Sequence, residues 1–540
     1  MTSPLTARAA VIDRLASTAV DVVVIGGGIT GAGIAWDAVT RGYRVAVIER
    51  DDVASGTSSK SSKLVHGGMR YLATGDLAMV AEGVRERERL RRLAPHLVHP
   101  LSFVVPTNTT NDRAMLQTAL LIYDGIGLFG GARTHRSLRP HEVYALAGLR
   151  SGAERGGFRY YDAQTDDARL TLAVIQMARA AGALVLNHAE AVDLQVAGGR
   201  VRGVDVRDRL GGDTFGVTGR WVVDATGVWA GRVARSHGIS AAAIAPAKGI
   251  HLTFDTADLP VQAAVVLPSA ARDGRRVFLV PWGRQVYVGT TDDHYDGPLD
   301  EPSVTDEDAD YLLAAVNTAF GTSLSAADAI GAWAGLRPLI EAAGHTRDLS
   351  RRHLVVEAPD RLVTVTGGKL TTFRQIAQDV VDHLARADGV RTRTQTTRRP
   401  LGATGRPLDG LARTRQAVSA LGIEETLAGS LYHRHGDLAS VVAARAAASG
   451  EGDRLVPGLP YLVGEVRQAV RAELAMTLDD VLQRRLRVSL RHAAAGGAAI
   501  DAAARIVAQE LEWDDAERDR QVADYRSRVA VERGVVPLRS

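Results

Sequence analysis

The chain has 540 residues, of which 46% are hydrophobic and 24% are charged, and this length predicts two or three domains rather than one core. The 65 basic and 62 acidic residues leave a formal net charge of +3, which is too weak a field to indicate a nucleic-acid-binding protein. There is no cysteine, which excludes disulfides, thiolate nucleophiles, cysteine-bound zinc and iron–sulfur clusters. Any redox chemistry must therefore use another cofactor, and no metal site is predicted.

The N-terminus does not read as a targeting segment. Residues 1–20 carry Arg8, Asp13 and Arg14 and lack the continuous apolar core of a signal peptide. The nearest approach to a membrane-spanning stretch, 114–129, is interrupted by Gln117 and by several glycines. We expect a cytoplasmic protein, and surface attachment to a membrane stays open.

The segment DVVVIGGGITGAGIAWDAVTRGYRVAVIER (21–50) predicts a strand, a glycine turn, a helix and a second strand. Its two apolar runs are typical of parallel strands buried on both faces. Gly26, Gly28 and Gly31 have the spacing of a dinucleotide-binding turn, where backbone approaches a pyrophosphate at a helix N-terminus. Glu49 ends the second strand, where an acid can accept hydrogen bonds from ribose hydroxyls. Because strand, turn, helix and acid agree, we expect a dinucleotide rather than an ordinary glycine-rich turn.

The next segment, SSKSSKLVHGGMRYL (58–72), is too polar for a core strand and too varied for a flexible linker. Its small hydroxyls and exposed amides suit contact with the rest of a long cofactor. A charged amphipathic helix is predicted over 78–97, whereas 100–155 has no clear pattern.

Beyond residue 160 the pattern alternates between helix and strand. We expect a helix over 170–181, strands over 184–186, around Gly198-Gly199 and over 221–225, antiparallel strands over 248–295, and a last strand over 362–365. Two of these strands end in glycine turns, at Thr226-Gly227 and at Gly367-Gly368. Either turn alone is ordinary, but three glycine turns returning to one sheet favour an extended FAD over NAD.

The segment RTRTQTTRRPLGATGRP (391–407) is basic, polar and interrupted by proline and glycine, which indicates an interdomain linker. Its five arginines suit a solvated linker better than a nucleic-acid contact, because no aromatic residue is interleaved for stacking. The remainder is helical in pattern. Thr477 is the expected N-cap of a helix beginning near Leu478, and 506–529 reads as one further helical segment.

The motifs together resemble the FAD-dependent, respiratory type of glycerol-3-phosphate dehydrogenase. The likeness begins with the segment from Asp21 to Leu72 and continues in YYDAQTDDARL, KGIHLTF, VFLVPWGRQVYVGTTD, GLRPLI, TRDLS and VTVTGGKLTTFR. It ends in ELAMTLDDVLQRR and ELEWDDAERDRQVADYR, and so covers nearly the whole chain.

The resemblance implies an α/β fold, with a glutathione-reductase-like Rossmann FAD domain, an antiparallel-sheet substrate domain and a C-terminal all-helical domain. The FAD-dependent region is expected over 1–390, the linker over 391–407 and the helical domain over 408–540. Within the first region, the FAD-binding parts are expected at about 20–90, 155–235 and 355–390, and the substrate-domain parts at about 91–154 and 236–354.

FAD is the cofactor that the resemblance implies, bound without a metal. The residues expected to hold it are Gly26, Gly28, Gly31, Glu49, Arg50, Thr57, Ser58, Ser59, Ser62, His66, Gly67, Gly68, Thr226, Gly227, Gly368, Lys369, Leu370 and Thr371.

The implied substrate, sn-glycerol 3-phosphate, is a small dianion that needs fixed cations, and it would be oxidised to dihydroxyacetone phosphate. The residues in matching segments are Arg70, Tyr71, His251, Arg337, Arg347 and Lys369, of which His251, Arg337 and Lys369 are expected to be catalytic. Arg337 lies in an apolar stretch, where an unpartnered charge is costly, so a bound anion is its expected partner. A surface arginine is the alternative.

The hydroxyl proton of this substrate needs a base while its C2 hydride leaves. His251 is the candidate, because the intrinsic pKa of a histidine suits proton transfer, although a strand histidine is often a satisfied core residue. His66 is the rival, but the resemblance places the His-Gly-Gly segment beside the flavin, where backbone approach matters more.

Three other readings compete with a quinone-linked dehydrogenase. Glycerol-3-phosphate oxidases, which reduce oxygen to hydrogen peroxide, are similar but carry an inserted segment that this chain lacks. Amino-acid-oxidase-type flavoenzymes need a single carboxylate-binding arginine, and a nucleic-acid-associated flavoprotein would explain only the 391–407 arginines. We also expect peripheral attachment to the inner face of the cell membrane, for which Arg484, Arg485 and Arg487 offer a basic helix face that otherwise is simply solvated. A homodimer is compatible with the sequence.

Overall fold

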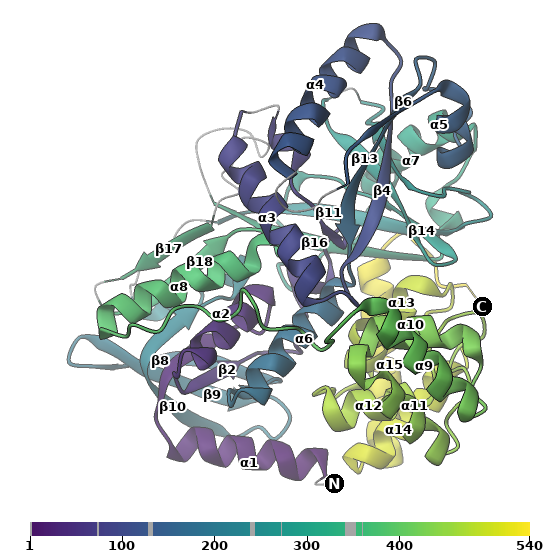
Figure 1. The fold of residues 1–540 in the computed structure, drawn as a ribbon. Helices are drawn as coiled ribbons and strands as arrows, with labels where there is room; N and C mark the ends of the chain where they lie inside the picture. Colours follow the sequence, from purple (N-terminus) through teal and green to yellow (C-terminus); the bar gives the residue numbers. More distant parts are fainter. Residues whose placement is uncertain are drawn as a thin grey trace.

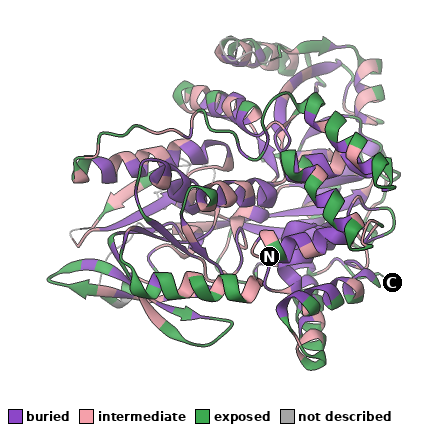
Figure 2. Cartoon of the chain, turned by 60° about the horizontal axis from the view of Figure 1, so that its bottom comes forward, coloured by how far each residue is buried: buried purple, intermediate pink, exposed green. Residues whose placement is uncertain are grey.

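The computed structural model describes residues 3–72, 75–127, 133–237, 244–271, 273–340, 353–358 and 360–539. Two β-sheets and a bundle of C-terminal helices lie side by side (Figure 1). Buried residues concentrate on the strands, and exposed residues lie on the outward faces of the peripheral helices (Figure 2). In the part of the chain that is described, no helix is both long and apolar enough to cross a membrane.

The first sheet is the parallel sheet that the N-terminal apolar runs predict. Its strand order is β17 (His353–Glu357), β18 (Leu362–Gly367), β10 (Thr214–Asp224), β1 (Val20–Ile25), β2 (Val45–Ile48) and β7 (Leu184–Leu186), with only β17 antiparallel to its neighbour along this path. The first half of β10 pairs with β9 (Arg200–Asp208), which pairs with β8 (Ala189–Ala197), so the three strands form an antiparallel meander. β10 is longer than predicted.

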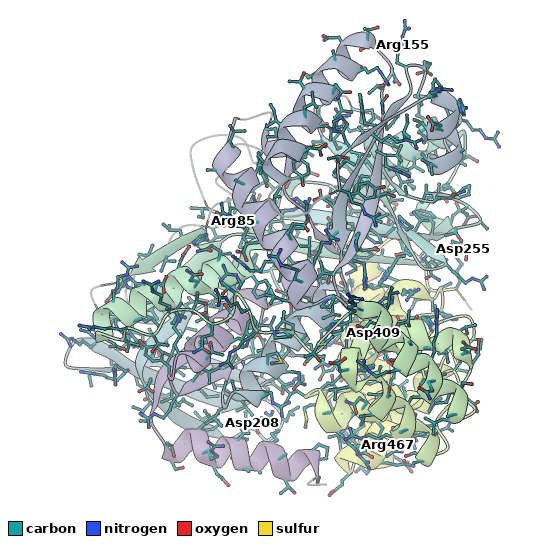
Figure 3. The ribbon with its side chains drawn as sticks, in the orientation of Figure 1. Arg85, Arg155, Asp208, Asp255, Asp409 and Arg467 are labelled. Atoms are coloured by element: carbon teal, nitrogen blue, oxygen red, sulfur yellow. The ribbon has the colours of Figure 1, made fainter. Side chains whose placement is uncertain are left out.

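Both faces of this sheet are buried. One face packs against α2 (Ile29–Thr40), α6 (Asp167–Ala180) and α8 (Phe373–Asp388). The other packs against the meander and α1 (Pro4–Ser17). Arg8 of α1 pairs with Asp208 at 2.6 Å, which fixes the helix on the end of β9 (Figure 3). Burial on two sides explains why β1 and β2 are continuously apolar rather than alternating.

The second sheet is largely antiparallel, as the alternation over 248–295 predicts. It runs β15 (Asp293–His294), β11 (Ile244–Asp255), β14 (Gln285–Gly289), β13 (Arg276–Trp282), β12 (Ala264–Pro268), β4 (His99–Pro106), β6 (Gly157–Gln164) and β3 (Leu64–Val65), with β16 (Gly331–Ile340) on β11 and β5 (Arg136–Leu138) on β6. One face is covered by α5 (Pro140–Ala147) and α7 (Asp306–Phe320), and the other by α3 (Leu77–Leu93) and α4 (Thr110–Gly127).

The charged helix predicted over 78–97 is α3, but it ends at Leu93 because the residue before Pro95 disfavours helical backbone. Its charges are not all solvated. Glu86 and Arg87 are buried, Glu86 accepting from Arg374 of α8 at 2.7 Å and Arg87 pairing with Asp162 of β6. The helix therefore joins the two sheets.

The C-terminal helices are α9 (Pro407–Ala420), α10 (Ala428–His435), α11 (Ala439–Ala448), α12 (Gly464–Ala472), a single π-helical segment η11 (Asp480–Arg485), α13 (Val488–Arg491), α14 (Ala499–Leu511) and α15 (Asp515–Arg533). The one helix predicted over 506–529 is two helices, because Glu512 adopts a left-handed conformation (φ 56°) and Asp514 caps α15. The predicted cap Thr477 still accepts a hydrogen bond from Asp480 N–H at 3.2 Å, although Asp479 is the N-cap residue.

The predicted linker contains no helix or strand over 391–406, and its arginines 391, 393, 398, 399 and 406 are exposed. It is nevertheless held to the first sheet's helices. Thr394 and Thr396 both donate to the buried carboxylate of Asp37, the latter at 3.1 Å, and Leu401 is buried in the core beside them. The predicted domain limits themselves stay predictions.

The prediction of an exposed basic face at Arg484, Arg485 and Arg487 is wrong. All three side chains are buried, and they contact the loop after β2 and the start of α6. Arg484 and Arg485 contact Asp52 at 2.7 and 2.6 Å, and Arg487 pairs with Asp166 and Asp167. Charge spacing on one helix does not reveal carboxylates more than 300 residues away, and these supply the partners that a buried guanidinium needs.

Three histidines cluster where the C-terminal helices meet β4. The rings of His99 and His433 lie 4.1 Å apart, and His433 Nδ1 is 3.1 Å from the carbonyl oxygen of His96. Burial, together with neighbouring positive groups, lowers the pKa of His96 and of His99 from 6.5 to about 3. Both imidazoles are therefore neutral in the folded protein near pH 7.

We predict that this cluster makes the fold acid-sensitive. Below pH 6.5 these histidines bind protons in the unfolded chain but remain unprotonated in the folded protein. The free energy of unfolding therefore falls as the pH drops from about 6.5 towards 3. By pH 5 each histidine should contribute a loss of about 2 kcal/mol. Urea unfolding at pH 7 and pH 5 checks this. His99→Gln should reduce the difference in unfolding free energy between pH 7 and pH 5, whereas His294→Gln, at an exposed position, should leave it unchanged. Equal pH dependence of stability in the two variants would contradict the prediction.

Candidate active site

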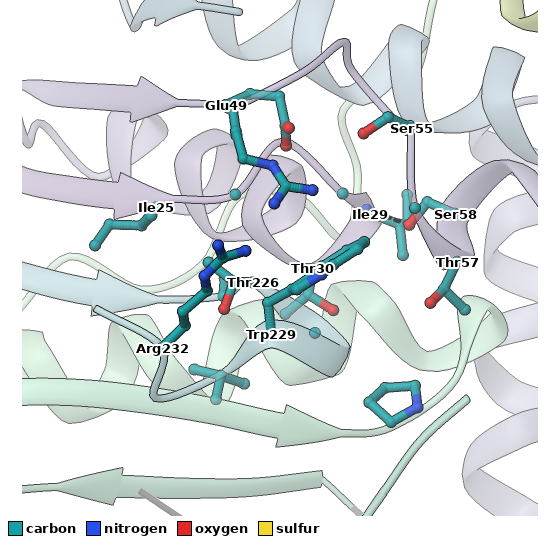
Figure 4. A pocket seen from close by; sticks show the side chains of 18 of the residues that line it. Ile25, Ile29, Thr30, Glu49, Ser55, Thr57, Ser58, Thr226, Trp229 and Arg232 are labelled. Atoms are coloured by element: carbon teal, nitrogen blue, oxygen red, sulfur yellow. Dashed lines mark hydrogen bonds between the residues drawn. The ribbon is translucent and has the colours of Figure 1, made fainter. Parts of the chain in front are cut away.

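A cavity opens at the carboxyl ends of β1, β2, β10 and β18, where all three predicted glycine turns meet (Figure 4). This edge of a parallel sheet is where such folds bind ligands. The predicted residues on its wall are Gly26, Gly28, Glu49, Arg50, Thr57, Ser58, Thr226, Gly227, Gly368, Lys369 and Leu370.

The first glycine turn is shaped by close backbone contacts. Gly26 has a φ of 106°, and a Cβ there would come within 2.7 Å of the Ala225 carbonyl oxygen. A Cβ on Gly31 would overlap the carbonyl oxygen of Gly26, so Gly31 supports the turn from below and does not line the cavity. The turn brings the N-terminus of α2 to the cavity, where its partial positive charge favours phosphate.

Glu49 fixes the second side of the cavity. Its carboxylate accepts hydrogen bonds from Gly27 N–H at 2.6 Å and Asp51 N–H at 2.8 Å. Burial, together with the charge of Asp51, raises its pKa to about 7, although these two backbone donors oppose the shift. A carboxylate has about four acceptor positions, so Glu49 can also accept from ribose hydroxyls.

The loop after β2 closes the cavity from above. Ser58 Oγ accepts from Ile29 N–H at 2.9 Å, and Thr57 Oγ1 donates to the Leu336 carbonyl oxygen at 2.6 Å. Ser55, one of the small hydroxyls expected to contact the cofactor, lines the wall, and so does Trp229, which the sequence did not indicate. The Arg50 guanidinium lies 5.1 Å from the centroid of the Trp229 ring. Trp229 comes two residues after Gly227, and that position next to a glycine turn is the signal that could have found it.

The other predicted cofactor residues lie off this wall: Ser59, Ser62, His66, Gly67, Gly68 and Thr371. His66 N–H donates to Thr371 Oγ1 at 3.1 Å, which joins the two segments. A Cβ on Gly68 would lie 2.6 Å from the Tyr71 ring, and one on Gly67 would overlap the Tyr123 hydroxyl. Packing against tyrosines thus requires these glycines, a reason that the sequence did not reveal.

The cavity fits a dinucleotide: a glycine cradle that a Cβ would fill, a helix N-terminus, an acid at the end of β2, and a wall continuing to the third turn. Residues 21–382 match the family model described as FAD dependent oxidoreductase, and residues 361–518 match the C-terminal domain of alpha-glycerophosphate oxidase. A glycerol-3-phosphate dehydrogenase from Mycobacterium leprae is 39% identical over 97% of this chain and 90% of its own length.

The chain belongs to the FAD-dependent glycerol-3-phosphate dehydrogenase family.

Other relatives agree with this placement. A probable mitochondrial glycerol-3-phosphate dehydrogenase of Caenorhabditis elegans is 35% identical over 95% of this chain and 74% of its own length. The crystal structure of the glycerol-3-phosphate dehydrogenase from Bacillus halodurans, complexed with FAD, has a TM-score of 0.83 at 29% identity and covers 98% of both chains. Glycine oxidase from Geobacillus kaustophilus, at 22% identity and a TM-score of 0.53, shares the fold alone. The family's cofactor is FAD, and the predicted fold class is confirmed.

In this dehydrogenase-family chain, Lys369 and Tyr71 lie together at the third glycine turn. The Lys369 ammonium is 3.9 Å from the centroid of the Tyr71 ring, close enough for a cation–π interaction. The ring is nearly buried, and the segment before it is shaped around it by Gly68. Two of the predicted substrate residues are thus brought together, 298 positions apart in the sequence.

The guanidinium of Arg337 already has partners within the protein. Its guanidinium donates to Asp292 at 3.0 Å, to Thr290 Oγ1 at 2.9 Å and to the Thr291 carbonyl oxygen at 3.1 Å. The expectation that it lacked a protein partner is therefore wrong, because the turn between β14 and β15 supplies these partners. The side chain passes over Gly249, where a Cβ would overlap it.

His251 lies on the same face of β11 and β16 as Arg337, because the pairings His251–Trp333 and Ala247–Arg337 are an even number of residues apart. Its ring stacks on Trp333 at 4.6 Å, and its Nε2 is 2.9 Å from Ser62 Oγ. Burial, then the charges of Lys63 and Arg337, hold its pKa well below 6.5, so the imidazole is neutral and retains a basic nitrogen. His251 is buried and does not line the FAD cavity.

Two predicted substrate residues are not placed. Arg347 lies outside the described residues. Arg70 falls in the short 3₁₀ turn Met69–Leu72, and only its backbone is described.

We predict that Gly31→Ala abolishes FAD binding, because the added methyl group would displace the Gly26 carbonyl and open the phosphate turn. The ratio of flavin absorbance at 450 nm to protein absorbance should fall at least about tenfold. Gly125→Ala is the matched control, since a Cβ there meets nothing within 4 Å. A full flavin content in Gly31→Ala would show that the turn tolerates the shift.

Proposed function

We propose that the chain oxidises sn-glycerol 3-phosphate to dihydroxyacetone phosphate and passes the electrons to a membrane quinone. The observation that carries the proposal is the 39% identity, over 97% of this chain, to a protein named glycerol-3-phosphate dehydrogenase. Bound FAD supplies the two-electron acceptor for such a reaction.

Two cations support a dianionic substrate: Lys369, which lines the cavity, and Arg337, whose neighbour Pro338 lines it. Lys369, held over Tyr71, offers a fixed ammonium beside the third glycine turn. Arg337 is oriented by Asp292 and Thr290, so its guanidinium is in place before any ligand arrives. Preorganised cations of this kind bind phosphate strongly, because no side-chain freedom is lost on binding. Arg70 and Arg347 are proposed to add to this site.

Proton removal is the second requirement. His251 is proposed as the base, because its imidazole is neutral and its Nε2 is hydrogen-bonded to Ser62 Oγ at 2.9 Å. That hydroxyl can orient the ring or relay the proton, and the Trp333 stack prevents the ring from turning. His251 and Arg337, on neighbouring strands, would together set the position of the substrate hydroxyl.

A second candidate is an oxidase that reduces oxygen to hydrogen peroxide. It is favoured by the match of residues 361–518 to the C-terminal domain of alpha-glycerophosphate oxidase. The relatives at 38% and 39% identity carry the dehydrogenase name, and that likeness extends over 97% of the chain. We therefore prefer quinone as acceptor.

Surface attachment to a membrane would bring the quinone to the site, and α4 offers the surface. Met115, Leu121 and Ile122 are 64%, 58% and 44% exposed on this helix, which lies at the end of the molecule opposite the C-terminal helices (Figure 1). Exposed apolar side chains on one helix suit insertion into the headgroup region of a bilayer. We propose this surface as the membrane contact in place of the C-terminal arginines, because those arginines are buried.

We predict that anaerobic sn-glycerol 3-phosphate bleaches the flavin absorbance of the purified holoprotein, whereas glycerol at the same concentration does not, because it lacks the phosphate that Lys369 and Arg337 would bind. Flavin that stays oxidised would refute the substrate assignment. The reduced protein should then be reoxidised much faster by a soluble quinone than by air-saturated buffer. The reverse order would establish the oxidase.

A second prediction concerns α4. Replacing Leu121 and Ile122 by glutamate should lower cosedimentation with phosphatidylglycerol–phosphatidylethanolamine vesicles by about tenfold or more, since each lost apolar contact weakens insertion by roughly 1 kcal/mol or more. Turnover with a soluble quinone should not change. Leu438→Glu, at a 57% exposed position of the C-terminal region, is the matched control. Equal binding by all three proteins would remove α4 as the attachment surface.

A further inference from the structure

A buried carboxylate, Asp167, lies at the start of α6 behind the FAD cavity. Its Oδ2 accepts hydrogen bonds from the backbone N–H and the hydroxyl of Ser61 at 3.0 and 2.7 Å. Its Oδ1 accepts from Lys63 Nζ at 3.0 Å and from Arg487 of the C-terminal region. One carboxylate thus connects the loop that closes the cavity with a part of the chain 320 positions away.

Arg487 contacts this cluster through Nε and Nη2, while its Nη1 donates to the Gln483 carbonyl oxygen at 3.3 Å. Besides Asp167, it donates to the Ser59 carbonyl oxygen at 3.1 Å and to Asp166 at 3.2 Å. Its backbone is left-handed, with a φ of 56°, a conformation that costs a non-glycine residue about 1 kcal/mol or more. Such a conformation persists when the surrounding contacts demand it, and here they direct the side chain towards the loop.

The cluster balances its own charge. Lys63 and Arg487 carry two positive charges, and Asp166 and Asp167 carry two negative charges, all in a buried setting. Removing one charged member leaves an uncompensated buried charge, which typically costs about 3–5 kcal/mol and forces its neighbours to move. The neighbours of this cluster are the residues that hold the proposed base.

The loop segment 59–63 contacts the proposed base directly. Ser62 Oγ is the hydrogen-bond partner of His251 Nε2, and the Ser61 carbonyl oxygen accepts from Trp333 Nε1 at 3.1 Å. Lys63 Nζ lies 4.6 Å from the centroid of the Trp333 ring, on which His251 stacks. A shift of this segment would therefore move both the stacking partner and the hydrogen-bond partner of His251.

We propose that Arg487 is a positioning residue for the oxidation: through Asp167 it fixes segment 59–63, and through Ser62 and Trp333 it sets the orientation of His251. The C-terminal helices then take part in the chemistry without touching substrate. The inference rests on the proposed function for its kinetic consequence, but the loop-holding role is independent of it.

The experiment compares Arg487→Met with Arg491→Met in the full-length holoprotein. Arg491 is the matched control, because it also joins the C-terminal helices to the second sheet, donating to Gln285 Oε1 at 2.8 Å. Within the described parts of the chain its hydrogen bonds go to Gln285, Tyr461 and Trp282, and none goes to segment 59–63. Hydrogen exchange of the peptide spanning 57–66 is measured in the apoprotein and the holoprotein. Anaerobic stopped-flow gives the rate constant of flavin reduction and the apparent Kd for sn-glycerol 3-phosphate.

We predict faster exchange of the Ser61 amide in Arg487→Met but not in Arg491→Met, since that amide donates to Asp167. The reduction rate constant should fall about tenfold to a hundredfold, because a misplacement of roughly 1 Å costs about this much. The apparent Kd should change less than about threefold, since the proposed cations are untouched. Arg487→Lys should recover part of the rate, as its ammonium can reach Asp167 but cannot also fork to Ser59 and Asp166.

If Arg487→Met does not fold, Ser61→Ala removes one of the two hydrogen bonds from Ser61 to Asp167 and should give the same pattern more weakly. Equal exchange and equal reduction in Arg487→Met and Arg491→Met would overturn the proposal, as would a lowered melting temperature with unchanged kinetics. Failure of the unmodified holoprotein to be reduced would instead refute the proposed function, and the exchange comparison would still decide whether Arg487 holds the loop.

Discussion

Two buried carboxylates, Asp52 and Asp167, flank the loop that closes the FAD cavity, and each is neutralised by arginines from the C-terminal helices. Asp52 accepts from Arg485 through both oxygens, at 2.6 and 2.8 Å, and from Arg484 at 2.7 Å. Asp167 accepts from Arg487. A buried ion pair contributes little stability overall, but separating its partners is strongly unfavourable. These buried ion pairs therefore hold the loop and the C-terminal helices together.

This constraint explains the local backbone of the C-terminal segment. Three arginines within four positions converge on two places: Arg484 and Arg485 contact Asp52, whereas Arg487 contacts Asp166 and Asp167. A regular α-helix would turn successive side chains about 100° apart and so would direct Arg484 and Arg485 away from a shared partner. The segment instead forms a π-helical turn over Asp480–Arg485, followed by a left-handed residue at Arg487. Both features are uncommon and typically occur at functional positions.

The local parts of the site could be predicted from sequence, whereas the long-range contacts could not. Gly26, Gly31 and Glu49 act within one strand–turn–helix–strand unit, so their spacing alone specifies where they lie. The ionic partners of Arg337 and Arg487 come from other elements, and nothing in the neighbouring residues identifies Asp292 or Asp167. The requirement for glycine at position 67 also comes from a residue distant in the sequence, because a Cβ there would overlap the hydroxyl of Tyr123 on α4.

The arrangement also separates two tasks that a single loop would otherwise combine. The first half of the loop, at Thr57 and Ser58, is fixed by Leu336 and Ile29 and faces the cofactor cavity. The second half, at Ser61 and Ser62, is fixed by Asp167 and faces His251. Because different partners hold the halves, a change at Arg487 can disturb the base while leaving the cofactor wall in place. We therefore expect loss of FAD and loss of the proposed proton transfer to be separable, because different partners hold the two halves of the loop.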